Sequence, residues 1–338
     1  GGATVVMKNI IDELQRRYAE NYEVTVFTCD GENPQPYQLR EYEYDDVNVT
    51  ALSVPASPTM EWNYQDEEVE RVFKAYLESR HPDLVHFHSM QRLTASPLHA
   101  TEEYEIPYVV TVHDAWWLSD HQFLIDQDGN AVDELQRNPL IAAQTSVDIV
   151  SSLERTDYLA RGLNSARRIL AVSDYQADLY RRNGFANVEV NKNGVGLPDT
   201  KAHAPAAEKS SQAGLQLAYL GGVCRHKGYY FLKAVYSRSR LANLHLRIVD
   251  FDTATKHTEQ WGDNTVEFVP PFDMENMAGF YCNIDVIVAP SIWPESFGLI
   301  SREALLMGKW VVAADAGGLA EDVTEGIDGH VFPLGDSD

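Results

Sequence analysis

The sequence predicts an α/β protein made of two Rossmann-like domains, each built on a parallel sheet. Short apolar segments alternate with helical patterns in both halves of the chain, which is typical of parallel strands covered by helices. A stretch of Pro, Ala, Lys, Ser and Gly without periodicity separates the two halves. The length of 338 residues also fits two domains of ~150 residues each. We therefore expect an N-terminal domain at 1–197, a linker at 198–214 and a C-terminal domain at 215–338.

The first domain begins with Gly1-Gly2 and a helical pattern that runs to Tyr18. A glycine pair that leads into a helix usually follows a strand, so we expect a first strand that precedes this sequence. An amphipathic helix is predicted at 67–80, and Ser173 with Gln176 forms a capping-box pattern. The strands predicted in this domain are 24–28, 47–54, 84–88, 108–112 and 168–172.

In the second domain the same alternation restarts. Its clearest unit is 284–314, where an apolar strand leads through a turn into a helix that ends at Gly308 and is followed by another strand. Further helices are expected beyond Asp338. The elements predicted in this domain are strands at 215–220, 244–249, 266–269, 284–289 and 310–314, with helices from 229 and at 274–281.

Two carboxylates lie in this unit, Glu295 in the turn and Glu303 about one turn into the helix. Helical side chains lean toward the N-terminus, so both carboxylates can face the carboxyl edge of the sheet, where open α/β sheets bind ligands. The N–H groups of Phe297-Gly298-Leu299 suit an anion or sugar hydroxyls. The alternative is that the two acids only complement the helix dipole.

The segment Gly221-Gly-Val-Cys-Arg-His-Lys-Gly228 follows one predicted strand and precedes a helix. Its glycines would let the backbone approach a phosphate, which Arg225 and Lys227 would neutralise. The GxxxxGK[ST] pattern of a Walker loop is absent. The alternative is a tight turn with exposed basic residues.

Composition excludes several functional classes. The formal net charge of -24 would repel duplex nucleic acid or an anionic membrane unless a local basic patch intervened. The three cysteines are far apart and form no CxxC, which argues against a disulfide framework or a zinc site and favours a reducing cytosol. No apolar run approaches the ~18 residues that a membrane span needs.

His86, His88 and His113 lie at the carboxyl ends of neighbouring predicted strands. Three histidines permit a metal, but no acidic fourth ligand has diagnostic spacing, so we predict no metal site. We interpret His113-Asp114 as a hydrogen-bonding pair in which Asp114 orients the imidazole or caps the next segment. The pair Trp116-Trp117 is either a platform for stacking a sugar or part of the core.

Taken in order, these motifs resemble those of the family 4 retaining glycosyltransferases, which have the two-domain GT-B fold. The resemblance covers most of the chain, and it rests on the ordered set because each motif alone is weak. The motifs are Gly1-Gly2, Asp83-Leu-Val-His86, Thr111-Val-His-Asp114, Ala171-Val-Ser-Asp174, Asn193-Gly194, Lys227-Gly228, Pro290-Ser291, Glu295 with Glu303, and Gly317-Gly318 with Glu321.

The resemblance implies roles for individual residues. Glu303 would accept hydrogen bonds from the donor's ribose, Glu295 would hold the transferred sugar, and Lys227 would bind the diphosphate. The implied donor-binding set is Gly2, Arg225, Lys227, Glu295, Ser296, Phe297, Gly298, Leu299 and Glu303. The implied catalytic set is His113, Asp114 and Glu295, and the acceptor side is Trp116, Trp117, His121 and Phe123.

One position departs from the family pattern. The family commonly has arginine five positions before the lysine of its Lys-Gly pair, and here that position is Gly222. Either Arg225 supplies the missing charge, or the leaving group is held less tightly.

The resemblance implies transfer of a hexose or deoxyhexose from a nucleotide-diphosphate sugar to a glycan, lipid-linked glycan or other hydroxyl acceptor, with retention of configuration. Lys227, Arg225 and the helix start at Leu299 would stabilise the departing diphosphate, so no cofactor or metal is expected. Two alternatives stay open: a GT-B sugar-nucleotide epimerase, and a non-catalytic nucleotide-sugar-binding module of a larger polysaccharide-assembly protein. The expected location is the cytoplasm, with peripheral binding at the inner face of the membrane left open.

Overall fold

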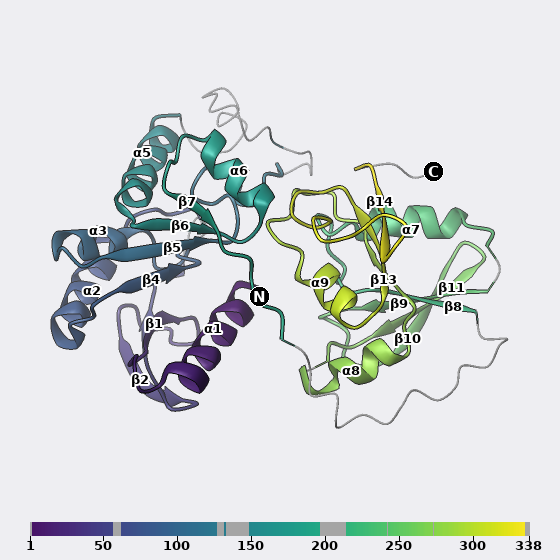
Figure 1. Ribbon diagram of the computed structural model, residues 1–338, viewed down its shortest axis with the longest axis horizontal. Helices are drawn as coiled ribbons and strands as arrows, with labels where there is room; N and C mark the ends of the chain where they lie inside the picture. The colour runs from purple at the N-terminus through teal and green to yellow at the C-terminus, as the bar shows by residue number, and fades with distance from the viewer. Residues whose placement is uncertain are drawn as a thin grey trace. The chain divides into compact units, whose positions relative to one another are not determined.

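The computed structural model describes residues 2–56, 62–126, 132, 149–196, 214–241, 243–272 and 274–334 (Figure 1). The chain divides into two compact units. The first comprises 1–122 and 133–194, and the second comprises 123–132 and 195–338. Phe123 is grouped with the second unit although the residues before it belong to the first. The predicted linker lies outside the described residues except for Gly214.

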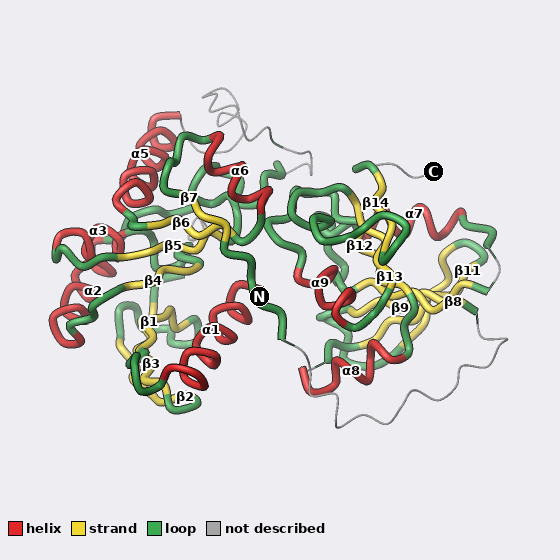
Figure 2. The backbone as a smooth tube through the Cα atoms, viewed as in Figure 1, coloured by secondary structure: helices red, strands yellow, loops and turns green. Residues whose placement is uncertain are grey.

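The first unit contains two sheets (Figure 2). One has the order β1-β3-β2, in which β1 and β3 are parallel and β2 is antiparallel to β3. The other is the parallel sheet β4-β5-β6-β7. The strands are β1 (Thr25–Asp30), β2 (Leu39–Tyr44), β3 (Val47–Ser53), β4 (Val85–His88), β5 (Tyr108–Val112), β6 (Arg168–Ala171) and β7 (Val188–Val190). The helices are α1 (Gly2–Tyr18), α2 (Glu67–Arg80), α3 (Ser96–Glu103), α5 (Ile149–Ser165) and α6 (Asp174–Arg182).

Local sequence signals account for the ends of two helices. In α2, the carboxylate of Asp66 accepts hydrogen bonds from the N–H groups of Glu68 and Val69, both at 3.0 Å. In α6, the hydroxyl of Ser173 accepts from the N–H of Gln176 at 3.0 Å, which confirms half of the predicted capping box. The amide of Gln176 does not complete the box, because it donates to the backbone oxygen of Asp114 at 2.8 Å.

The second unit is one seven-stranded sheet with the order β10-β11-β9-β8-β12-β13-β14. All neighbouring strands are parallel except β10, which is antiparallel to β11. The strands are β8 (Leu215–Tyr219), β9 (Leu244–Val249), β10 (His257–Trp261), β11 (Asn264–Val269), β12 (Val286–Ala289), β13 (Trp310–Ala314) and β14 (Gly329–Phe332). The helices are α7 (Tyr229–Arg238), α8 (Met274–Cys282) and α9 (Leu299–Leu306).

The strand order of the second unit fixes where a ligand can bind. Without β10, the order is that of a doubly wound sheet, in which the chain direction across the sheet reverses between β8 and β12. Loops that follow two such strands diverge and leave a crevice at the carboxyl edge of the sheet. The loops concerned are 220–228 after β8 and 290–298 after β12.

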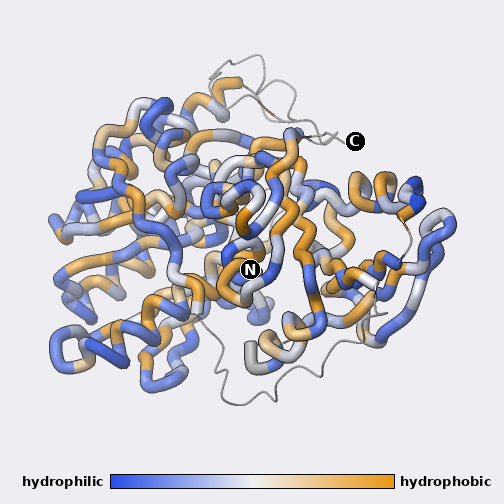
Figure 3. The backbone as a smooth tube through the Cα atoms, turned by 45° about the vertical axis from the view of Figure 1, so that its right-hand side comes forward, coloured by the Kyte–Doolittle hydropathy of each residue, from blue (hydrophilic) through white to orange (hydrophobic). Residues whose placement is uncertain are grey.

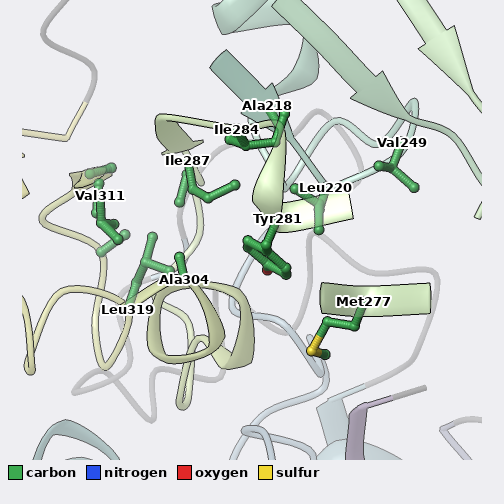
Figure 4. Close-up of a cluster of buried hydrophobic side chains, with 14 of the residues drawn as sticks. Ala218, Leu220, Val249, Met277, Tyr281, Ile284, Ile287, Ala304, Val311 and Leu319 are labelled. Atoms are coloured by element: carbon green, nitrogen blue, oxygen red, sulfur yellow. The ribbon is translucent and has the colours of Figure 1, made fainter. Parts of the chain in front are cut away.

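Two hydrophobic cores cover the two faces of this sheet. One core joins α8 and α9 to the sheet and includes Met277, Tyr281, Ile287, Ala304 and Val311 (Figure 4). The other core joins α7 to the sheet, and its largest side chain is the buried Trp261. Figure 3 shows hydrophobic and hydrophilic stretches alternating along the backbone. The sheet is therefore closed on both faces, and its edge carries the exposed loops.

Among the described residues, no helix combines the length and the apolar character that crossing a membrane requires.

Candidate functional site

The loops after β8 and β12 approach each other closely. Gly228 has a φ of +83°, and a Cβ at this position would lie 1.8 Å from the backbone oxygen of Pro290. The N–H of Ile292 donates to the backbone oxygen of His226 at 3.0 Å. Only glycine leaves room for this contact, so Gly228 joins the predicted phosphate-binding loop to the turn before α9.

We expect Gly228→Ala to destabilise the second unit more than Gly308→Ala. Both glycines have positive φ, but a Cβ at Gly308 would meet nothing within 4 Å. The comparison isolates the steric contact with Pro290, which we expect to cost about 1–3 kcal/mol beyond the backbone strain that both variants share. Urea unfolding of the two variants measures the difference, and equal destabilisation would contradict the close contact.

Lys227 and Glu295 form the centre of the site. The Lys227 ammonium lies 3.0 Å from one carboxylate oxygen of Glu295, and the hydroxyl of Ser291 donates to the other oxygen. Glu295 is only 7% exposed, so the lysine neutralises a charge that burial would otherwise make costly. The Lys227 ammonium also lies over the ring of Trp293, 5.1 Å from its centroid. The sequence motifs assigned separate ligands to these two residues and did not predict their ion pair.

Two further side chains near this pair were not predicted from the sequence. The hydroxyl of Tyr219 and the indole N–H of Trp293 are buried and have no hydrogen-bond partner among the described residues. Burial raises the pKa of Tyr219, and the nearby acidic groups of Cys224 and Glu295 raise it further. Unsatisfied buried donors cost stability unless a ligand or water meets them. In the sequence, these two residues could have been noticed as an aromatic residue at the end of β8 and a second aromatic residue that stands two positions before Glu295.

Glu303 lies in α9 beside the buried Tyr281 of α8. Burial raises the pKa of the Glu303 carboxyl to about 7, and the Tyr281 hydroxyl offsets part of this increase. Figure 4 shows the Tyr281 ring between α8 and Ala304, the neighbour of Glu303 in α9. A carboxyl whose pKa is raised in this way is typical of functional sites.

Gly298 and Arg302 fix the conformation of the turn before α9. Gly298 has a φ of +76°, and a Cβ there would lie 2.8 Å from the side chain of Leu319. The Arg302 guanidinium lies 3.8 Å from the ring centroid of Phe297 and donates to the backbone oxygens of Phe297 and Gly318. Among the described residues, the N–H groups of Ser296, Phe297 and Gly298 have no acceptor. They are therefore available at the start of α9, which begins with Leu299.

Gly222 occupies the position at which the family commonly has arginine, and a long side chain there would require its surroundings to move. Gly222 has a φ of +64°, and a Cβ there would lie 2.9 Å from the ring of Phe251. Arg225 is exposed, and within the described residues its side chain forms no ion pair. Gly2, the remaining donor-side candidate, is the exposed first residue of α1 in the first unit.

The first unit brings its three histidines together at the carboxyl edge of β4 and β5, as the sequence predicts. His88 Nδ1 lies 3.0 Å from His113 Nε2, and His86 Nε2 lies 2.7 Å from the hydroxyl of Thr111. Burial lowers the pKa of His86 and of His113 to about 4 and that of His88 to about 2. All three imidazoles are therefore neutral at pH 7.

Of the two roles predicted for Asp114, the structure shows the capping role. Its carboxylate accepts from the N–H of Trp116 at 2.9 Å and from the amides of Gln91 and Gln122 at 2.9 and 2.7 Å. No hydrogen bond joins it to His113 among the described residues. Burial raises the pKa of Asp114, and the three donors oppose that increase.

The acceptor-side candidates are in different environments. Trp116 and Trp117 are 1% and 3% exposed, which matches the core alternative and leaves neither ring face open for stacking. His121 is half-buried, and its Nε2 has no partner among the described residues. Phe123 belongs to the second unit, where it stacks on His226 with 5.2 Å between ring centroids.

No metal centre is formed by the described residues. Within them, no three His, Cys, Asp or Glu side chains converge as a metal ion would require, and this includes the three histidines at β4 and β5.

Two family models match this chain, one in each half. The family described as Glycosyl transferase 4-like domain matches residues 1–194, and the family described as Glycosyl transferases group 1 matches residues 214–338. The chain belongs to the family 4 glycosyltransferases. Its relatives include the D-inositol 3-phosphate glycosyltransferase of Arthrobacter sp. (strain FB24), with 27% identity over 98% of this chain and 79% of the relative.

Solved structures show that this glycosyltransferase has the GT-B fold. Sucrose-phosphate synthase from Thermosynechococcus elongatus matches with a TM-score of 0.63 and 18% identity, over 98% of this chain and 81% of that one. Anabaena HepE in complex with UDP-glucose matches with a TM-score of 0.57 and 17% identity, over 93% of this chain and 86% of that one. The predicted fold class and the predicted enzyme class are thus confirmed.

Proposed function

We propose that this glycosyltransferase moves a hexose or deoxyhexose from a nucleotide-diphosphate sugar to a hydroxyl of a glycan or lipid-linked glycan, with retention and without a metal. The observation that carries the proposal is the Lys227–Glu295 pair, which joins the loops on the two sides of the crevice between β8 and β12. This cation and carboxylate, with Glu303 as the proposed second carboxylate, match a ligand that combines a diphosphate with sugar hydroxyls. The solved relative with bound UDP-glucose supports a donor of this class.

The donor is expected to separate the Lys227–Glu295 pair. A diphosphate offers Lys227 a stronger partner than one carboxylate, and the sugar hydroxyls replace the lysine as partners of Glu295. The free N–H groups at Ser296, Phe297 and Gly298 add hydrogen-bond donors at a helix N-terminus. Glu303 accepts hydrogen bonds from the ribose, and Arg225 is the nearby second cation that can approach the phosphates.

Transfer breaks the bond between the anomeric carbon and the diphosphate oxygen and forms a bond from that carbon to the acceptor oxygen on the same face. The acceptor's proton moves to the departing diphosphate, whose negative charge Lys227 stabilises. His113, with a neutral imidazole, lies beside the transferred sugar. The three free cysteines fit a reducing compartment, and we propose that the reaction takes place in the cytoplasm.

Product analysis with purified protein tests the reaction. A sugar nucleotide and an acceptor should yield a free nucleoside diphosphate and a glycosylated product whose anomeric configuration matches the donor. An epimerised sugar nucleotide formed without acceptor would instead support the epimerase alternative. If the reaction needs no metal, the rate of transfer should be unchanged when a chelator is added.

The pH dependence of donor binding tests the role of Glu303. Only the ionised carboxylate accepts from both ribose hydroxyls, and with a pKa of about 7 its ionised fraction rises about tenfold between pH 6 and 8. Donor affinity, measured by calorimetry, should rise by a similar factor. The unliganded protein should lose stability over the same range, because a raised carboxyl pKa means that the folded state binds the extra proton. Glu303→Gln should abolish both trends, and a pH trend that survives this substitution would contradict the assignment.

A further inference from the structure

His88 and His113 are hydrogen-bonded across two neighbouring strands. His88 is the last residue of β4, and His113 follows directly after β5. The atoms that meet are Nδ1 of His88 and Nε2 of His113, at 3.0 Å, and the rings are tilted by 31°. Among the described residues, His113 Nδ1 has no hydrogen-bond partner. His113 therefore has one nitrogen fixed by the protein and one available to a ligand.

The hydrogen bond couples the tautomers of the two rings. Burial keeps both imidazoles neutral at pH 7 by lowering their pKa values. A neutral imidazole carries one N–H and one acceptor nitrogen, so one ring must donate in this bond and the other must accept. Whether Nε2 of His113 donates or accepts in this bond then determines whether its Nδ1 is an acceptor or a donor.

The surroundings hold His88 in place. The ring of His86 lies against it with 4.1 Å between centroids, and His86 is itself bonded to Thr111. Thr111 belongs to β5, two residues before His113. His88 is thus enclosed by groups from both strands, and its ring cannot turn without breaking the bond to His113.

We propose that His88 is a positioning residue for this glycosyltransferase, which holds the ring of His113 through the bond at Nε2 so that Nδ1 stays available to the transferred sugar. The inference rests on the proposed function, in which His113 lies beside that sugar. It adds a residue that touches no substrate and acts through its neighbour.

Two nearly isosteric substitutions provide the test. The side-chain amide of asparagine lies three bonds from Cα, as Nδ1 of histidine does, whereas the amide of glutamine lies one bond further. His88→Asn therefore keeps a polar atom opposite His113, and His88→Gln moves it away. We expect His88→Asn to retain kcat within about threefold and His88→Gln to lower kcat by about 10–100-fold. The donor KM should stay nearly constant in both, because His88 itself touches no substrate in this proposal.

A spectroscopic measurement separates this inference from the proposed function. Nitrogen-15 NMR of the histidine rings should show a hydrogen-bonded Nε2 in His113 of the wild type and of His88→Asn, and the loss of that bond in His88→Gln. Equal kcat values, or the same Nε2 resonance in the two variants, would overturn the positioning role. Absence of transfer by the wild type with every donor would instead overturn the proposed function, while the NMR result would still decide the role of His88.

Discussion

Replacing Lys227 by methionine is expected to lower kcat/KM for sugar transfer by roughly 10²–10³-fold, the typical loss when one group that stabilises developing negative charge is removed. The variant loses the one cation that lies 3.0 Å from Glu295 in the crevice. It also leaves the Glu295 carboxylate, which is 7% exposed, without its counter-charge. Steady-state kinetics of transfer measure the loss.

Lys233→Met is the matched control for Lys227→Met. Lys233 also pairs with a carboxylate, that of Glu259 at 3.5 Å, and lies over a tryptophan ring, that of Trp261. It belongs to α7, outside the loop 220–228. Transfer by Lys233→Met should match the wild type, and an equal loss in the two variants would show that Lys227 acts only through stability.

Arg302→Met is expected to destabilise the second unit strongly, with a loss of about 3–5 kcal/mol in its free energy of unfolding. The guanidinium is buried, lies 2.6 Å from the Asp322 carboxylate and donates to the backbone oxygens of Phe297 and Gly318. Its removal takes away the cation that holds the turn before α9 against the loop at Gly318. Urea unfolding followed by tryptophan fluorescence measures the change.

Arg247→Met provides the comparison for Arg302→Met. Arg247 also pairs with a carboxylate at 2.6 Å, that of Glu267, and also lies over a phenylalanine ring, that of Phe280. Its side chain is 25% exposed, against 7% for Arg302. We expect Arg247→Met to cost about 1 kcal/mol or less. If the two variants unfold at the same urea concentration, burial of the Arg302 pair does not contribute as argued.

Helices and strands whose hydrophobic residues recur at a regular spacing, or form a continuous apolar run, were predictable from sequence. The helix 67–80 and the strands 108–112 and 244–249 have the boundaries that the hydrophobic pattern indicates. The unit 284–314 forms the strand, turn, helix and strand expected of it. Parallel strands bury both faces, so their apolar runs are continuous and easy to detect.

The strands that were missed lack such runs. All residues of β2 are exposed, and its sequence, Leu-Arg-Glu-Tyr-Glu-Tyr, carries three charges. β10 is an edge strand that pairs only with β11 among the described strands, and four of its five residues are polar. At an edge, backbone pairing does not require an apolar side chain on each face, so the hydrophobic signal is weak.

The sequence motifs singled out Lys227, Glu295 and Glu303 as candidates, but they did not indicate which contacts these side chains make. Glu295 and Glu303 lie in different environments. Glu295 pairs with Lys227, whereas Glu303 is buried beside Tyr281. Asp114 caps the segment at Trp116, while the amides of two glutamines occupy its other oxygen. The capping contact is local and was one of the predicted alternatives, whereas the contacts of Glu295 with Lys227 and of Glu303 with Tyr281 join residues far apart in the chain, where no local pattern records them.

The most direct test of donor binding by the second unit is calorimetric titration of the wild type, Lys227→Met and Glu303→Gln with UDP-, GDP-, dTDP- and ADP-sugars. We expect at least one sugar nucleotide to bind the wild type without added metal. Its affinity should fall about tenfold or more in each variant, in line with the loss of one charged hydrogen bond. Binding that is equally tight in all three proteins, or absent for every sugar nucleotide, would contradict the assignment of the crevice between β8 and β12 as the donor site.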